Sequence, residues 1–255
     1  MRKAFSKKKE DKPIGYATEA EAIRCCLICG KSVPPRYLSY NDRWISGECP
    51  CEAAVRRKQE EERFYLKRHQ ELLQYAYDWA GSSFSLREHA KKTFENYNQQ
   101  RFPDAYNVVR HFATHAVGTL VLYGSYGTGK SHLLAALCNR RIRLGLESRF
   151  VPSLVLFSAL QDCRQREDNT ERLLSRMRTT PLLILDDIDK AHWTDYREEV
   201  YTDILEARSL RDLPTAVSTN KLQELASYIG GAAASRLKIG QISVEMFGSD
   251  YRERL

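Results

Sequence analysis

A glycine-rich stretch near the middle of the chain has the residues that bind phosphate groups. Gly124 and Gly129 enclose four residues and are followed by Lys130 and Ser131, which fits the G-x-x-x-x-G-K-[ST] pattern of a P-loop. Glycines let backbone N–H groups converge on phosphate oxygens, the lysine reaches the β- and γ-phosphates, and the serine hydroxyl ligates Mg²⁺. The stretch predicts a nucleoside triphosphate site. The alternative is a glycine-rich turn that fits the pattern by accident.

Two carboxylates after an apolar strand supply a second part of this chemistry. Residues 181–185 are apolar and end in Asp186 and Asp187. Ligands of open α/β sheets bind beyond the carboxyl ends of the strands. We therefore predict that Asp186 holds Mg²⁺, directly or through water, and that Asp187 orients the attacking water as general base. The alternative is an acidic turn. A second apolar strand, 215–219, ends in Asn220, whose amide is suited to positioning water near the γ-phosphate.

The full prediction for this site combines the glycine-rich stretch with the strand ends. The nucleotide-binding residues are expected to be Gly124, Ser125, Tyr126, Gly127, Thr128, Gly129, Lys130, Ser131, His132 and Asp186.

Five of the seven cysteines lie in the first fifth of the chain. Cys26 and Cys29 form a C-x-x-C pair, and Cys49 and Cys51 supply a second pair that starts 20 residues after Cys29. Four thiolates in two close pairs suit tetrahedral Zn²⁺, and the loop between them is too short to build its own core. We predict zinc bound by these four cysteines. Cys25 is a competing ligand, and a set of unrelated thiols is the alternative.

Composition and charge narrow the class of protein. The chain has 255 residues, 42% of them hydrophobic, and a formal net charge of +7, which favours nucleic acid or another acidic partner, although a basic solvated surface gives the same charge. No apolar run approaches the roughly 20 residues of a membrane span. The basic residues 1–9 are not followed by an apolar core, so they do not form a secretory signal. A cytoplasmic protein with reduced cysteines and no membrane contact is expected.

The elements that position these residues alternate in the α/β manner. Strands are expected at 120–123, 148–151, 181–185 and 215–219, and helices at 52–74, 104–116, 130–144, 153–164 and 170–178. The charge-dense helix at 52–74 is expected to end before the break at Gly81-Ser82-Ser83. These patterns predict a zinc-binding N-terminal module at 1–55, a helical linker at 56–82 and an ATPase domain at 83–255.

An ordered set of motifs resembles the AAA+ ATPases, and among them the DnaC/DnaI-type bacterial or phage helicase loaders and the related IstB transposition ATPases. The resemblance covers roughly residues 84–255. Its marks are Phe94-Glu95-Asn96-Tyr97, the stretch Leu122 to Leu133 that contains the P-loop, Leu183-Ile184-Leu185-Asp186-Asp187-Ile188, Ser218-Thr219-Asn220, Ser235-Arg236-Leu237 and Gly248-Ser249-Asp250-Tyr251-Arg252.

The resemblance implies a fold and a set of residue roles. The fold is a P-loop AAA+ domain with a parallel sheet flanked by helices and without a separate lid domain, since the chain stops just after Arg252. Lys130 lies in Walker A, and Asp186 and Asp187 form Walker B. Asn220 matches sensor 1, Arg236 the arginine finger and Arg252 a sensor 2-like arginine. The second Walker B acid is Asp where most AAA+ proteins have Glu, which suggests slow turnover and matches the loader subgroup.

The resemblance also implies partners. The zinc module is expected to bind a DnaB-type replicative helicase, and the ATPase domain ATP and single-stranded DNA, with slow, DNA-stimulated hydrolysis and self-association in a helicase-bound ring or spiral. Arginines between the strands at 150 and 183 could follow a DNA backbone, or could form an ordinary solvated helix face: Arg164, Arg166, Arg172, Arg176 and Arg178. Two other functions stay open, an IstB-like transposition helper that coats duplex DNA and an adaptor that uses ATP as a switch without turnover.

Overall fold

A computed structural model describes residues 15–40, 42–77, 87–166, 170–190 and 194–251. The chain divides into two compact units, an N-terminal unit, Met1–Leu66, and a C-terminal unit, Lys67–Leu255. The expected break at Gly81-Ser82-Ser83 and the boundary at 82/83 lie outside the described residues, as does Arg252.

The N-terminal unit is built from short elements. They are α1 (Glu19–Ala22), β1 (Arg24–Cys25), β2 (Ser32–Val33), β3 (Arg36–Leu38), β4 (Arg43–Ile45) and the start of α2 (Pro50–Tyr77). Strands β1 and β2 form one antiparallel pair, and β3 and β4 form another. Helix α1 begins with a capping box in which Thr18 and Glu21 exchange hydrogen bonds with each other's backbone. The helix expected at 52–74 is α2, which ends at Tyr77 in the C-terminal unit.

The C-terminal unit is an α/β domain. Its helices are α3 (Arg87–Ala90), α4 (Pro103–Thr114), α5 (Lys130–Arg143), α6 (Ser153–Gln165), α7 (Thr170–Thr179), α8 (Asp195–Ser209), α9 (Leu225–Ile229) and α10 (Gly231–Leu237). Its strands are β5 (Thr119–Tyr123), β6 (Arg149–Pro152), β7 (Leu183–Asp186), β8 (Thr215–Thr219) and β9 (Gln241–Glu245).

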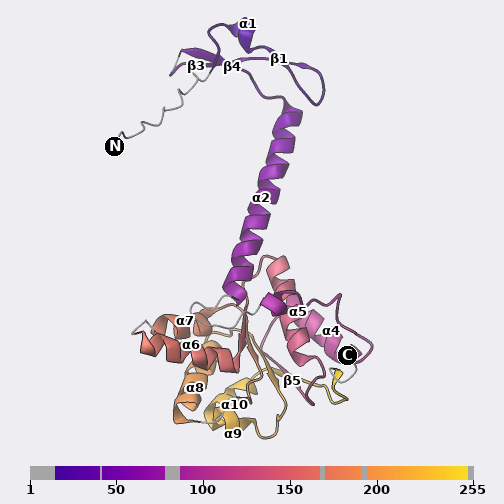
Figure 1. Cartoon of the computed structure of the whole chain (residues 1–255), viewed down its shortest axis with the longest axis vertical. Helices are drawn as coiled ribbons and strands as arrows, with labels where there is room; N and C mark the ends of the chain where they lie inside the picture. The colour runs from indigo at the N-terminus through magenta and orange to yellow at the C-terminus, as the bar shows by residue number, and fades with distance from the viewer. Residues whose placement is uncertain (1–14, 41, 78–86, 167–169, 191–193, 252–255) are drawn as a thin grey trace, which may run out of the picture. The chain divides into compact units, whose positions relative to one another are not determined.

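The five strands pair in parallel in the order β6-β7-β8-β5-β9. Helices α4 and α5 cover one face of the sheet, and α6, α7, α8 and α10 cover the other (Figure 1). All residues of β7 and β8 are buried, as expected of central strands that helices cover on both faces. The predicted α/β fold with a parallel sheet flanked by helices is therefore confirmed.

In the C-terminal unit the sequence pattern misses β9, and in the N-terminal unit it does not predict the short strands β1–β4. Ile242 is exposed while Val244 is buried, so the segment has no continuous apolar run. It pairs with β5, the strand that leads into the P-loop, from Thr119↔Gln241 to Tyr123↔Glu245. The backbone then continues alongside the P-loop, where the Tyr251 N–H donates to the Gly127 carbonyl at 3.1 Å.

Candidate functional site

The P-loop connects β5 to the first residue of α5. Gly127 and Gly129 have φ of 67° and 98°, a left-handed backbone that favours glycine. The Lys130 ammonium donates to the carbonyls of Gly124 at 2.9 Å and Ser125 at 2.6 Å, so the loop is closed on its own lysine. Burial lowers the pKa of Lys130. The positive end of α5 and the P-loop amides offer the anion site that the sequence predicts.

The carboxyl end of β7 carries the predicted first Walker B aspartate, Asp186, in a buried position. Asp186 is 3% exposed, and its Oδ1 accepts a hydrogen bond from the Ser218 hydroxyl at 2.6 Å. Burial raises the pKa of Asp186 to about 6, and the neighbouring Asp187 charge acts in the same direction, whereas hydrogen bonds from Ser218 and Ser131 oppose the shift. A carboxylate beside the P-loop serine suits Mg²⁺, which would offset the cost of ionising Asp186. Mg²⁺ bound there would neutralise charge on the phosphates of a nucleotide.

The next residue, Asp187, sits in a strained turn. Its φ of 53° lies in the left-handed region, and its N–H donates to the Ser218 hydroxyl at 2.8 Å. Its carboxylate is ion-paired with Lys190. Asn220 is held close by, because its backbone and side-chain N–H groups donate to Asp189 Oδ2 at 3.0 and 3.3 Å. Hydrogen bonds therefore connect the segments that follow β7 and β8, past the last paired residues of the two strands.

These residues line a cavity of about 700 Å³. Of the predicted site residues, the lining includes Tyr126, Gly127, Thr128, Gly129, Lys130, Ser131, His132, Asp186, Asp187 and Asn220. His132 is turned toward the Phe94 motif, where its Nε2 donates to the Thr93 carbonyl at 3.0 Å and to Asn96 Oδ1 at 2.9 Å. The lining also includes residues that sequence reasoning did not assign to the site, namely His89, Lys92, Asn96, Tyr97, Asn98, Arg101, Lys190 and Tyr251. Asn96, Tyr97 and Tyr251 were marks of the family resemblance, and the others carried no signal.

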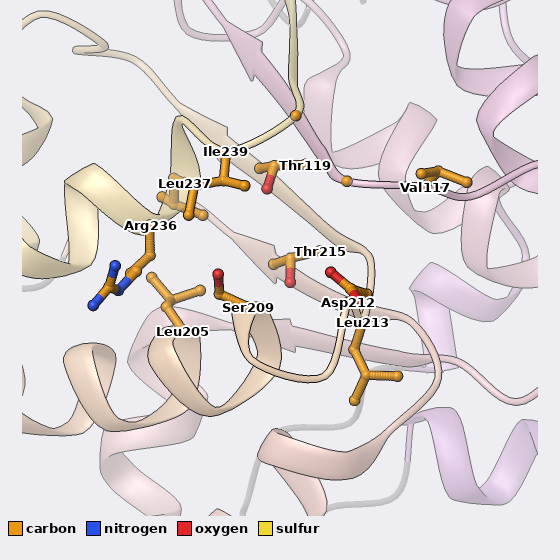
Figure 2. A pocket seen from close by; sticks show the side chains of 12 residues that line it. Val117, Thr119, Leu205, Ser209, Asp212, Leu213, Thr215, Arg236, Leu237 and Ile239 are labelled. Carbon is orange, nitrogen blue, oxygen red and sulfur yellow. The ribbon is translucent and has the colours of Figure 1, made fainter.

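The predicted arginine finger lies away from this cavity. Arg236 is on α10, where its Nη2 forms an ion pair with Glu206 at 3.1 Å. It lines a smaller cavity of about 230 Å³ at the amino ends of β5 and β8. Its guanidinium points away from Thr119 and Thr215 (Figure 2). Strand amino ends are opposite to the edge that carries the P-loop, so Arg236 does not reach the nucleotide cavity of its own chain.

The four predicted zinc ligands come together in the N-terminal unit. Their sulfur atoms all lie within 4.8 Å of one another, with Cys26–Cys51 and Cys49–Cys51 at 3.2 Å and Cys29–Cys49 at 3.6 Å. Zn–S bonds of about 2.3 Å in a tetrahedron separate the sulfurs by about 3.8 Å, so the cluster fits the predicted ion. The competing Cys25 is exposed and is not part of the cluster.

Hydrogen bonds around the cluster support metal binding. The N–H groups of Ile28 and Cys29 point at the Cys26 sulfur at 3.3 and 3.5 Å. The pKa of Cys49 is lowered to about 7 by the Cys51 backbone N–H and by the neighbouring thiols, whereas hydrogen bonding to Cys49 raises the pKa of Cys51 to about 12. Four thiolates at these separations repel one another, and a divalent cation among them offsets that repulsion.

The arginines proposed to follow a DNA backbone are not all available. Arg178 is ion-paired with both Glu171 and Asp203, and the Arg164 guanidinium lies 3.8 Å from the centre of the Tyr196 ring. Arg178 therefore makes its contacts within the chain.

Among the helices of the described residues, none is both long and apolar enough to cross a membrane.

Known proteins match the C-terminal unit. The profile of the family described as IstB-like ATP binding protein matches residues 84–230, more than half of the chain. The replicative helicase loader DnaC of Escherichia coli (strain K12) is 27% identical over 176 residues, which are 66% of this chain and 71% of that protein. The replicative helicase loader DnaI of Bacillus subtilis (strain 168) is 38% identical over 106 residues, which are 40% of this chain and 32% of DnaI.

A crystal structure of DnaI has the same fold, with a TM-score of 0.56 at 25% identity over 66% of this chain and 94% of that chain. The predicted AAA+ architecture of the loader group is thereby confirmed. The chain belongs to the family of IstB-like ATP binding proteins.

Proposed function

We propose that this protein is an ATP-dependent loader that binds a DnaB-type replicative helicase through its N-terminal unit and delivers it onto single-stranded DNA. The observation that carries the proposal is that the relatives of the nucleotide-binding unit are named replicative helicase loaders. The four-cysteine cluster supports it, since it gives the chain a small module outside the ATPase domain that can carry a separate binding role.

In this proposal each residue of the nucleotide cavity has a separate task. Lys130 leaves its two carbonyl partners and binds the β- and γ-phosphates, while Ser131 and Asp186 hold Mg²⁺. Asp187 leaves Lys190 and accepts a proton from the attacking water, which Asn220 helps to orient. ATP binding and slow hydrolysis then switch the loader between states.

The proposal also requires a second copy of the chain. Because Arg236 lies away from its own nucleotide cavity, it acts as an arginine finger only on a neighbouring subunit. This is the geometry expected of a ring or spiral of subunits assembled on the helicase.

The experiment that tests the function is co-purification with the replicative helicase, with and without ATP, followed by an ATPase assay with and without single-stranded DNA. We expect helicase capture and DNA-stimulated hydrolysis. Lys130→Ala should abolish ATP binding, because it removes phosphate-binding charge in the ground state, whereas Asp187→Ala should bind ATP and fail to hydrolyse it. Absence of helicase from the captured material would refute the loader role.

A second function deserves a test because the matching family profile is that of IstB-like proteins. A transposition helper would coat duplex DNA in the presence of ATP and would not retain the helicase. Sedimentation with duplex DNA, run beside the helicase capture, distinguishes the two.

A further inference from the structure

The nucleotide cavity contains a lysine that no phosphate-binding motif includes. Lys92 follows α3 and lines the cavity together with Asp186 and Asp187. Its side chain is half-buried; burial lowers its pKa, and attraction to the same two carboxylates opposes that shift. Lys91 is paired with Glu88, whereas among the described residues no ion pair includes Lys92. A cation is therefore held beside the predicted magnesium ligand, and no carboxylate in the described part of the chain lies at ion-pair distance from it.

The backbone around Lys92 is fixed to the helix that begins at the P-loop. The side-chain amide of Asn139, on α5, donates to the carbonyls of His89 at 2.9 Å and Lys92 at 2.6 Å. The Tyr77 hydroxyl in turn donates to Asn139 Oδ1 at 2.8 Å. Asn139 and Tyr77 are 5% and 8% exposed, so these bonds form in a dry environment where each is strengthened by the next.

We propose that Lys92 is a further phosphate-binding residue, which contacts the terminal phosphate of bound ATP, and that Asn139 and Tyr77 are its positioning residues. The inference rests on the proposed ATP-binding function. Asp186 would hold Mg²⁺, which would neutralise charge on the terminal phosphates, so the terminal phosphate would lie on the side of the cavity that holds Asp186. Its oxygens offer Lys92 the anionic partner that the described residues do not supply at ion-pair distance.

This arrangement has a consequence for the helix that precedes the domain. Tyr77 is the last residue of α2, so a displacement of the end of α2 would loosen Asn139 and with it the backbone of Lys92. The ability of the site to distinguish ATP from ADP would then depend on the end of that helix.

The test compares ATP and ADP affinities of the full-length protein by calorimetry. Lys92→Met keeps the length of the side chain and removes the charge. We expect ATP affinity to fall about tenfold, the effect of one charge-assisted hydrogen bond, while ADP affinity changes less than twofold. Lys92→Arg restores most of the ATP affinity. Lys91→Met, at the exposed neighbouring lysine, is the matched control and should leave both affinities unchanged.

Unchanged ATP affinity in Lys92→Met would overturn the assignment. An equal loss of ATP and ADP affinity would also overturn it, because the lysine would then contact a part of the nucleotide that ATP and ADP share. The wild-type protein, measured alongside, separates these results from failure of the proposed function. If it binds no ATP at all, both proposals are wrong.

The positioning residues are tested through the same ratio of affinities. Asn139→Ala and the milder Tyr77→Phe should each lower the preference for ATP over ADP, whereas a general loss of stability would weaken both nucleotides equally. When Asn139→Ala is combined with Lys92→Met, no further loss of preference is expected, because both act through one contact. Additive losses would show that Asn139 does not act through Lys92.

Discussion

The two units of the chain are held together in different ways. In the C-terminal unit a continuous hydrophobic core runs from Leu72 to Met246. In the described part of the N-terminal unit, the buried hydrophobic residues are Ala22, Cys26 and Val33. So few side chains cannot offset the conformational entropy of some fifty ordered residues, and the cysteine cluster occupies the place of a core. One unit depends on burial of apolar surface, and we expect the other to depend on a bound metal.

The two sites differ in a second way. All four predicted zinc ligands come from one chain and lie within 4.8 Å of one another. The nucleotide cavity has its P-loop and Walker B residues, but its predicted arginine finger, Arg236, lines a different cavity. The predicted metal site has all four of its ligands in a single copy, whereas we expect the nucleotide site to be completed by another copy.

The largest effect is expected from removing one zinc ligand. The wild-type protein should carry about one Zn²⁺ per chain, and Cys26→Ser should lose the metal, the folded structure of the N-terminal unit and helicase binding, since metal binding supplies the folding free energy. Metal content, limited proteolysis and helicase capture measure these losses. ATP affinity should be unchanged, because the core of the C-terminal unit contains none of the described residues of the N-terminal unit. Full metal content in Cys26→Ser would mean that the assignment of ligands is wrong.

The converse experiment disturbs the core. Arg208 is 1% exposed and donates to the carbonyls of Met177, Thr180 and Pro214 and to the Thr215 hydroxyl at 2.6–2.9 Å. Arg208→Met leaves these acceptors buried without donors, which should lower the free energy of unfolding of the C-terminal unit by about 3 kcal/mol. Chemical denaturation measures the loss. Zinc content should stay at the wild-type level, and a matching loss of zinc would contradict the independence of the two units.

Residues close together in the sequence were the ones that could be predicted. The P-loop, Asp186 with Asp187 and the two cysteine pairs are short local patterns whose chemistry follows from spacing. The strands at 120–123 and 181–185 were recognisable because continuous apolar runs mark strands covered on both faces. Each of these signals lies within a dozen residues, and only the combination of the two cysteine pairs spans a longer stretch, from Cys26 to Cys51.

Residues brought to the site by the tertiary fold could not be predicted in this way. Lys92 reaches the cavity because Asn139, 47 residues later, binds its backbone. Tyr251 does so because the chain after β9 bonds to Gly127. Ser218 stood within a recognised motif, yet its bonds to Asp186 and Asp187 depend on the pairing of β7 with β8. No local periodicity encodes these pairings.

A smaller effect tests whether the nucleotide site is shared between copies. Arg236→Ala should bind ATP normally and hydrolyse it roughly tenfold or more slowly, since an arginine finger stabilises charge that develops on the γ-phosphoryl group. Mixing it with Lys130→Ala subunits should restore part of the activity, because one variant keeps the P-loop and the other keeps the finger. ATPase activity is measured across mixing ratios, with assembly confirmed. Absence of recovery at every ratio would exclude action on a neighbouring subunit.

The smallest effect is expected around the metal, where a carboxylate connects the two cysteine pairs. Glu52 accepts the N–H of Leu27, in the first pair, and the N–H of Cys49, in the second, each at 3.2 Å. Arg24 binds both carboxylate oxygens and also donates to the Gly47 carbonyl at 2.9 Å. The bonds from Arg24, and with them those from the two N–H groups, hold the pKa of Glu52 well below its usual range. Glu52 is therefore ionised at neutral pH and fixes the positions of the two cysteine pairs relative to each other.

Glu52→Gln keeps the size of the side chain and removes the charge that orients Arg24. Groups in this position around a metal site are worth 10- to 100-fold in affinity, and we expect the lower end, about tenfold weaker zinc binding, because all four thiolates remain. Competition with a chelating dye measures the change. Glu48→Gln is the matched control, since Glu48 pairs with Arg56 at an exposed position and contacts neither cysteine pair in the described bonds. Equal zinc affinity in the two variants would show that the cysteines alone, without the carboxylate between them, organise the N-terminal unit.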